Sequence, residues 1–300
     1  MRGARRSTGK TGDRPVRPGG QALIDGVFMR THETWAIARA DGTVAVGRFA
    51  PPAMSEVPVG RVLGGLAAAM RIGVGRGLLG SSPGSESRGQ VRRRLLGALV
   101  GGEAAVVAAG WAPGWLGLPG WVSPVAAVLS VLAGLVVIRL VLPAALWRYH
   151  GAEHKAVAAF EQGVDLTDVD SVLACSRVHN RCGTNLVVLL ALIGGLLDRY
   201  PLVLQIPLFV LAIGIGAEIV GAAARRPGRR WSVAVLAGGR VMQRFLTTAE
   251  PTRAEQAIAC RALVACLAEH DASTQPHSGG SSAPPSAPNR PQNEVVAAVS

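Results

Sequence analysis

The chain is poor in aromatic and in charged residues. Of its 300 residues, 4% are Phe, Trp or Tyr and 17% are Asp, Glu, Lys or Arg, whereas 49% are hydrophobic. The mean hydropathy is +0.32, and the charges lie in blocks between apolar runs instead of being scattered. This composition is typical of an integral membrane protein and argues against a soluble one.

Paired cysteines, a secretion signal and a phosphate-binding loop are also missing. The four cysteines form no paired pattern, which argues against a disulfide framework. Arg5 and Arg6 are adjacent, but no apolar stretch follows the basic N-terminus, so we expect neither a signal peptide nor a twin-arginine signal. Neither G-x-x-x-x-G-K nor G-x-G-x-x-G begins at Gly19 or Gly20, which leaves little support for phosphate binding there.

The chain has a net charge of +12, which would suggest a nucleic-acid partner for a soluble protein. Here the arginines flank the apolar runs, and we attribute the charge to an anionic membrane surface. We therefore expect the lipid bilayer as a partner and no nucleic acid. A membrane-protein partner or a homo-oligomer is left open.

Four apolar runs predict transmembrane helices. Arginines cluster before the first run and after the last, and the Trp-rich turn between the first two runs has none. The positive-inside rule then predicts a multi-pass cell-membrane protein with both termini in the cytoplasm. The third run is short, so it either crosses a thinned bilayer or is re-entrant. The four runs are 95–110, 125–147, 184–197 and 200–224.

A small β-sheet is expected before the first span, on the cytoplasmic side. Residues 22–30 are predicted to form one strand, and residues 35–49 a hairpin that turns at Asp41 and Gly42. Residues 57–79 carry three arginines and fit an amphipathic helix in the membrane interface. The predicted fold class is mainly α: an integral membrane protein with about four transmembrane helices and this N-terminal sheet.

Composition divides the chain into five regions, with polar tails at both ends. The regions are a disordered basic tail (1–18), a cytoplasmic β-containing region with an interfacial helix (19–90), a four-span membrane domain that includes a cytoplasmic His/Cys segment at 148–183 (91–231), cytoplasmic helices with a break near 248–251 (232–270), and a disordered Ser/Pro/Gly-rich tail (271–300).

The stretch 149–161, YHGAEHKAVAAFE, holds the strongest chemical signal. On a helix, residues four apart lie on one face, so His150 and His154 would project side by side and could hold one zinc-type ion. Glu153 precedes the second histidine and could act on a water molecule at the ion. The pattern H-x-x-E-H is a metallohydrolase signature. The alternative is a polar juxtamembrane turn whose side chains contact water or lipid headgroups.

A second stretch, CSRVHNRCGTN at 175–185, adds further zinc-type ligands. Imidazole and thiolate are the usual ligands of zinc, which needs three or four of them from the protein. If the polar segment folds back, His179 and Cys182 would complete the shell begun by His150 and His154. The alternative is that the cysteines are small, buried apolar residues.

Three charged residues are further candidates for the site. Glu218 lies in the fourth apolar run near its predicted cytoplasmic end and is a candidate metal ligand; alternatively, it pairs with Arg139 or Arg225. Lys155 and Arg181 flank the proposed site and are candidates for binding an anionic substrate group such as a phosphate. The alternative for both is ordinary positive-inside charge.

Four motifs occur in order along the chain and together carry a family resemblance. They resemble the YqhQ-like family of bacterial membrane proteins over roughly residues 19–265. The resemblance implies a multi-spanning membrane protein of unknown function with a suspected metal site, labelled a predicted metal-dependent enzyme. Asp25, Asn180 and Ala217 stand where that family usually has Glu, Pro and Tyr. The motifs are GGQALIDGVFMR (19–30), YHGAEHK (149–155), HNRCGT (179–184) and FLTTAEP (245–251).

These features predict an enzyme that depends on a divalent metal, with zinc as the expected ion and hydrolysis at the cytoplasmic membrane face as the expected reaction. Glu153 would be the general base that takes a proton from water. The substrate would be a peptide bond or a lipid-linked ester. Two alternatives are kept: a membrane scaffold or assembly factor with a structural metal site, and a small transporter that uses Glu103 and Glu218.

Overall fold

The structure is a computed structural model that describes residues 16–49, 122–197, 200–274 and 295–297, with isolated positions between 93 and 119. The predicted interfacial helix at 57–79 lies outside these residues, as do most of the Trp-rich turn and nearly all of the first predicted span. The described part is mostly helical, with a small antiparallel sheet whose first four strands are N-terminal.

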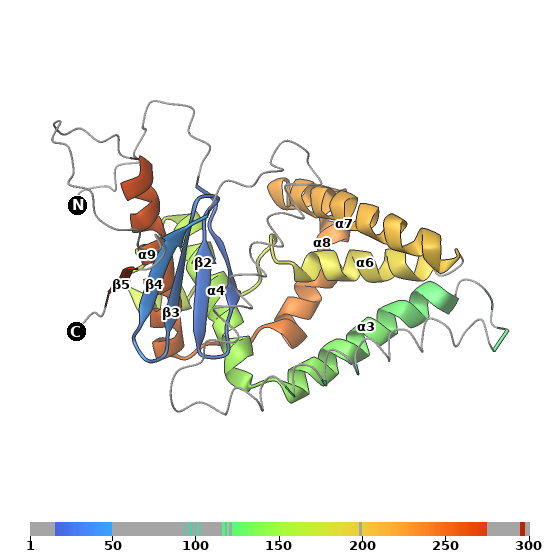
Figure 1. The fold of residues 1–300 in the computed structure, drawn as a ribbon, viewed down its shortest axis with the longest axis horizontal. Coiled ribbons are helices and arrows are strands. Elements are labelled where there is room, and N and C mark those ends of the chain that lie inside the picture. The colour runs from blue at the N-terminus through green and yellow to red at the C-terminus, as the bar shows by residue number, and fades with distance from the viewer. Residues whose placement is uncertain are drawn as a thin grey trace, which may run out of the picture.

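The sheet is an antiparallel meander with the order β1-β2-β3-β4-β5 (Figure 1). Asp41 and Gly42 form the predicted hairpin turn, in which Gly42 has the left-handed φ of 89° that favours glycine. The short β5 comes from the C-terminal tail and pairs with β4. The strands are β1 (Gly19–Ala22), β2 (Gly26–Arg30), β3 (Thr34–Arg39), β4 (Val44–Arg48) and β5 (Val295–Ala297).

The prediction of one strand over residues 22–30 is wrong, because the chain reverses in the middle of that run. The backbone N–H of Leu23 donates to the carbonyl of Gly26 at 2.9 Å and closes a tight turn between β1 and β2. Asp25 lies in this turn and accepts two hydrogen bonds from Arg39, at 2.7 and 2.8 Å. This ion pair binds the turn to β3 and gives Asp25 a structural role.

Two helices cover one face of the sheet (Figure 1): α4 (Ala144–Gln162) and α9 (Arg253–Thr274). Alternate residues of β2 and β3 point to this face and are buried against the alanine-rich side of α4 and against α9. The intervening residues Phe28, Trp35 and Ile37 form a second apolar cluster on the opposite face. The alternation therefore places α4 and its polar motif directly against β1 and β2.

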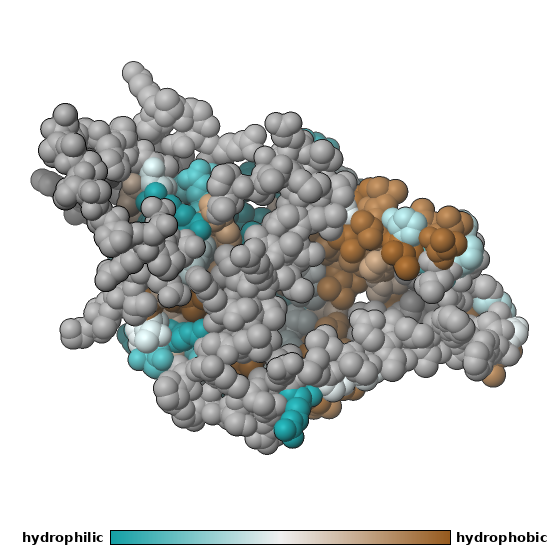
Figure 2. All heavy atoms as spheres, viewed as in Figure 1, coloured by the Kyte–Doolittle hydropathy of each residue, from teal (hydrophilic) through white to brown (hydrophobic). Residues whose placement is uncertain are grey.

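The other helices form a group beside the sheet (Figure 1): α3 (Val122–Val141), α6 (Thr184–Leu197), α7 (Leu202–Arg225) and α8 (Arg230–Met242). Large apolar side chains are exposed along α3, α6 and α7, and brown surface gathers there in Figure 2. Among the described residues, Val203–Arg225 is the helix that is long and apolar enough by itself to cross a membrane.

The predicted span 125–147 does not continue as one helix. It ends at Val141, and α4 starts at Ala144 after a bend of 109°. Pro143 lies at the break, where its missing N–H and fixed φ prevent the helix from continuing. The bend turns the chain from α3 onto the sheet, so Trp147 and the histidine motif belong to the sheet-covering helix.

Two further elements position the site. A short helix, α5 (Val169–Leu173), follows α4 and leads into the His/Cys stretch. After α8 comes a five-residue π-helix, η2 (Gln243–Thr247), and an extended segment at Thr248–Thr252 then separates it from α9. The predicted break near 248–251 is therefore confirmed.

Candidate metal centre

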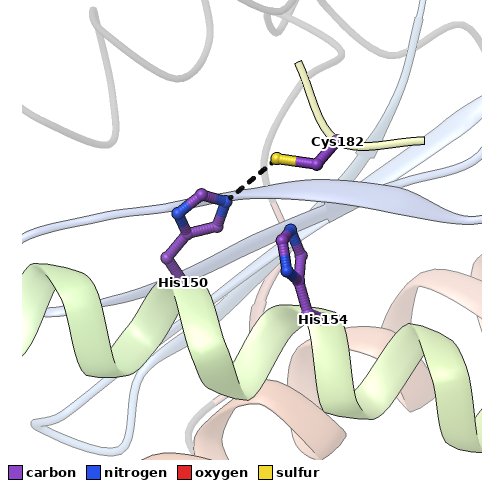
Figure 3. A group of neighbouring side chains, drawn as sticks. All are labelled: His150, His154 and Cys182. Carbon is purple, nitrogen blue, oxygen red and sulfur yellow. Dashed lines mark hydrogen bonds between the residues drawn. The ribbon is translucent and has the colours of Figure 1, made fainter. Parts of the chain in front are cut away.

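Three potential metal ligands meet between α4 and the loop before α6 (Figure 3). His150 and His154 lie on successive turns of α4, with ring centroids 4.4 Å apart. Cys182 approaches from residues that directly precede α6, and its Sγ lies 3.5 Å from His150 Nε2. One ligand atom from each of the three residues lies within 4.8 Å of the others. The fold thus brings one residue of the second motif beside the two histidines of the first.

Backbone carbonyls determine which nitrogen each histidine presents. His150 Nδ1 lies 2.6 Å from the Thr247 carbonyl oxygen, and His154 Nδ1 lies 2.6 Å from that of Arg177. A carbonyl oxygen can only accept, so both Nδ1 atoms carry the proton in the neutral rings. Each Nε2 therefore keeps its lone pair. This arrangement is the usual outer-shell support of a metal-binding histidine.

One hydroxyl group contacts the sulfur of Cys182, and a second hydroxyl contacts the first. Thr184 Oγ1 lies 3.2 Å from Sγ, and Thr247 Oγ1 lies 3.4 Å from Thr184 Oγ1. Cysteine binds metal through its sulfur in the thiolate form. Two imidazole nitrogens and one thiolate are a usual donor set for zinc, and the residues present fit this ion.

Glu153 faces the same region from α4 but is not one of the three grouped ligands. It is buried, and this burial raises its pKa to about 7 from the ordinary 4.5, against the opposing effects of His150 and of a hydrogen bond from the Gly20 backbone N–H. A carboxyl with a pKa near neutrality can both take up and release a proton at physiological pH.

Glycines allow the close approaches that build the site. A Cβ on Gly20 would overlap the Phe28 carbonyl and lie 3.0 Å from the Cγ of Glu153. A Cβ on Gly151 would overlap the carbonyl oxygen of Ala249, in the segment that follows η2. These contacts explain why glycine stands in the GGQ and YHGAEHK motifs.

The three ligands open onto a cavity of about 590 Å³. Its walls come from the edge strand β1, the first turns of α4 and the loop before α6. Phe28, Trp147 and Val157 give it apolar surface, and Arg30 and Arg181 add positive charge. A small substrate or one segment of a larger one could therefore reach the metal-binding atoms.

Of the other predicted site residues, two line the cavity and two do not. His179 lines the cavity, and the centroid of its ring lies 5.9 Å from that of His154. Its Nε2, however, lies 3.0 Å from a carboxylate oxygen of Glu161. Burial lowers the pKa of His179. Arg181 also lines the cavity and pairs with Glu161. The fold brings both residues beside the three ligands without adding either to the group.

Lys155 and Glu218 do not line the cavity. The buried Lys155 donates to the carbonyls of Leu173 and Cys175, at 2.6 and 2.9 Å, and pairs with Glu250 at 3.1 Å. Glu218 is exposed on α7. The structure therefore does not bring these two residues to the metal ligands.

Several residues of the site were not assigned from the sequence. Thr247 and Arg177 act through their carbonyl oxygens, and Thr184 acts through its hydroxyl. Thr247 lies in the FLTTAEP motif, so that motif was the available signal for it. Arg177 lies between Cys175 and His179, where a role of its backbone carbonyl leaves no trace in the sequence.

The chain is thus a mostly helical protein with a small sheet and a His/His/Cys cluster at the junction of the two. Residues 125–269, which include all three cluster residues, match a family described as "Protein of unknown function (DUF1385)". The "Uncharacterized protein YqhQ" of Bacillus subtilis (strain 168) is 32% identical over 83 residues. The chain is therefore similar to this family over residues 125–269, and the resemblance to the YqhQ-like family is confirmed.

The match to that relative is partial: it covers 25% of this chain and 26% of the length of YqhQ. No solved protein structure matches this chain.

Proposed function

We propose that this chain is an integral membrane metalloenzyme, a zinc-dependent hydrolase that acts at the cytoplasmic face. The observation that supports it most is the three-ligand group formed by His150, His154 and Cys182, open to a cavity that Glu153 also lines. A catalytic zinc site has three protein ligands and keeps one position for water or substrate, whereas a structural site is closed by four.

A bound zinc ion would supply Lewis acidity and lower the pKa of a water molecule beside it. Glu153 is placed to take the proton of that water, because it lines the cavity and has a pKa of about 7. Thr247 and Arg177 keep both histidines in the tautomer that binds metal. Arg181 at the cavity wall would hold an anionic group of the substrate.

The membrane location is supported by α7 and by the apolar side chains exposed along α3, α6 and α7. The cavity includes residues from the start of α4, just after the chain leaves α3, and from the start of α6, where the chain enters the apolar group again. A substrate at the membrane surface would suit this position. The proposal includes four transmembrane spans and cytoplasmic termini. It also includes a peptide bond or a lipid-linked ester as the substrate.

A structural metal site in a membrane scaffold is the second candidate. The position of His179, 5.9 Å from the His154 ring, favours it, because a modest shift of that ring would close a four-ligand shell. The two candidates differ in whether a metal position stays open to small ligands.

The test is the metal content of detergent-purified protein beside the His150→Ala and Cys182→Ala variants. We expect one zinc per chain in the wild type and its loss in both variants. In Co²⁺-substituted protein, a spectral change on adding a small hydroxamate would show an open position. A well-folded wild-type protein that binds no metal refutes the proposal of a metalloenzyme. A Co²⁺ spectrum that does not change with hydroxamate favours the scaffold with a structural metal site.

A further inference from the structure

We infer that Arg177 is the positioning residue that orients both metal-binding histidines, one through its carbonyl and the other through its guanidinium. This inference rests on the proposed metal site and deepens it. Arg177 lies in the loop between α5 and α6, 23 positions from His154 along the chain.

The first connection is direct. The carbonyl oxygen of Arg177 accepts the hydrogen bond from His154 Nδ1, at 2.6 Å. This bond determines the tautomer of His154 and the direction of its ring, so the position of the Arg177 backbone determines where His154 Nε2 points.

The second connection passes through η2. Arg177 Nη1 lies within hydrogen-bond distance of the carbonyls of Arg244 and Thr248, at 2.9 and 3.3 Å, and of Thr248 Oγ1, at 2.8 Å. It also lies 3.4 Å from the carbonyl of Gln243. The end of a helix leaves backbone carbonyls without helical partners, and the two N–H groups of Arg177 Nη1 lie where they can donate to the nearest of these acceptors.

The π-helix held in this way carries the partner of the other histidine. Thr247 is the last residue of η2, and its carbonyl oxygen lies 2.6 Å from His150 Nδ1. π-Helical turns are rare and occur often at functional sites. Through η2, Arg177 therefore also determines where the Nε2 of His150 points.

A second nitrogen of the Arg177 guanidinium anchors the arrangement. Its Nε donates to Glu250 Oε1 at 2.8 Å, and the other carboxylate oxygen of Glu250 pairs with Lys155 at 3.1 Å. A planar guanidinium with five donors can serve a carboxylate and several carbonyls together, whereas a lysine ammonium cannot reproduce this fork. The arrangement thus requires arginine and not merely positive charge.

The experiment compares Arg177→Lys and Arg177→Ala with Arg148→Ala as a matched control. Arg148 also joins its surroundings to a carboxylate, with its Nε 2.8 and 3.0 Å from the oxygens of Glu255, but it contacts neither carbonyl of the site. Zinc affinity would be measured by competition with a chelator. The Co²⁺ spectrum and the Nδ1–H resonances of selectively labelled histidines report on the geometry.

We expect Arg177→Lys to weaken zinc affinity about 10- to 100-fold, the usual effect of losing an outer-shell partner. The Co²⁺ spectrum and the His150 Nδ1–H resonance should change with it, while Arg148→Ala keeps both. Unchanged affinity and resonances in Arg177→Lys, or equal losses in Arg148→Ala, overturn the inference and leave the metal site standing. A wild-type protein that binds no metal refutes both the metal site and the role of Arg177. The failure of the inference alone can therefore be distinguished from the failure of the proposed function.

Discussion

Gly151→Ala tests the packing that builds the site, because two physical effects predict opposite signs for the resulting change in stability. In the interior of a helix, alanine is favoured over glycine by about 1 kcal/mol, so propensity alone predicts a more stable protein. Here the added Cβ would overlap the carbonyl oxygen of Ala249, which is backbone and cannot rotate away. Overpacking of this kind costs about 1–3 kcal/mol.

The clash should also reach the metal ligands. Ala249 donates its backbone N–H to the carbonyl of Trp147 at 2.8 Å, which holds the segment after η2 against α4. Moving this segment away from α4 moves Thr247 and lengthens its contact with His150. We therefore expect Gly151→Ala to lower the free energy of unfolding by up to about 2 kcal/mol net and to weaken zinc binding.

Denaturant unfolding in detergent and zinc competition provide the assay. Gly134→Ala in α3 is the control, because a Cβ there meets nothing within 4 Å and should not destabilise the protein. If Gly151→Ala proves as stable as the wild type and binds zinc equally well, the inference that α4 and Ala249 are in close contact is refuted.

Two further predictions concern ionisable residues. Burial raises the pKa of Glu153 from 4.5 to about 7. In metal-free protein, the contribution of Glu153 to the free energy of unfolding is therefore fully present below pH 4.5 and is lost as the pH rises through 7. The loss amounts to roughly 3 kcal/mol. Glu153→Gln should remove most of this pH dependence while retaining zinc and lowering turnover by roughly 10²- to 10⁴-fold; equal slopes of stability against pH in both proteins would contradict the assignment. Lys155→Met should destabilise the protein by about 1–3 kcal/mol, because the carbonyls of Leu173 and Cys175 lose their donor. Lys155→Met should leave substrate affinity unchanged and Arg181→Ala should lower it, so the reverse pattern in binding measurements would restore the prediction that Lys155 binds substrate.

Features that depend on local geometry could be predicted from the residue pattern. The spacing of four residues places His150 and His154 on one face of α4, and Asp41-Gly42 predicts the turn between β3 and β4. The apolar runs at 184–197 and 200–224 predict helices, and α6 and α7 occupy them. Each of these follows from residues within a few positions of one another.

Which distant groups join the histidines depends on long-range packing, and the residue pattern does not predict it. Cys182 joins them, whereas His179 lies beside Glu161 and Glu218 is exposed on α7, although all three carry suitable ligand atoms. The tautomers depend on the carbonyls of Thr247 and Arg177, which lie 97 and 23 positions from their histidines. Every residue has a backbone carbonyl, so the side-chain sequence cannot indicate which one will accept the bond; only the packing of η2 and of the loop before α6 against α4 decides it.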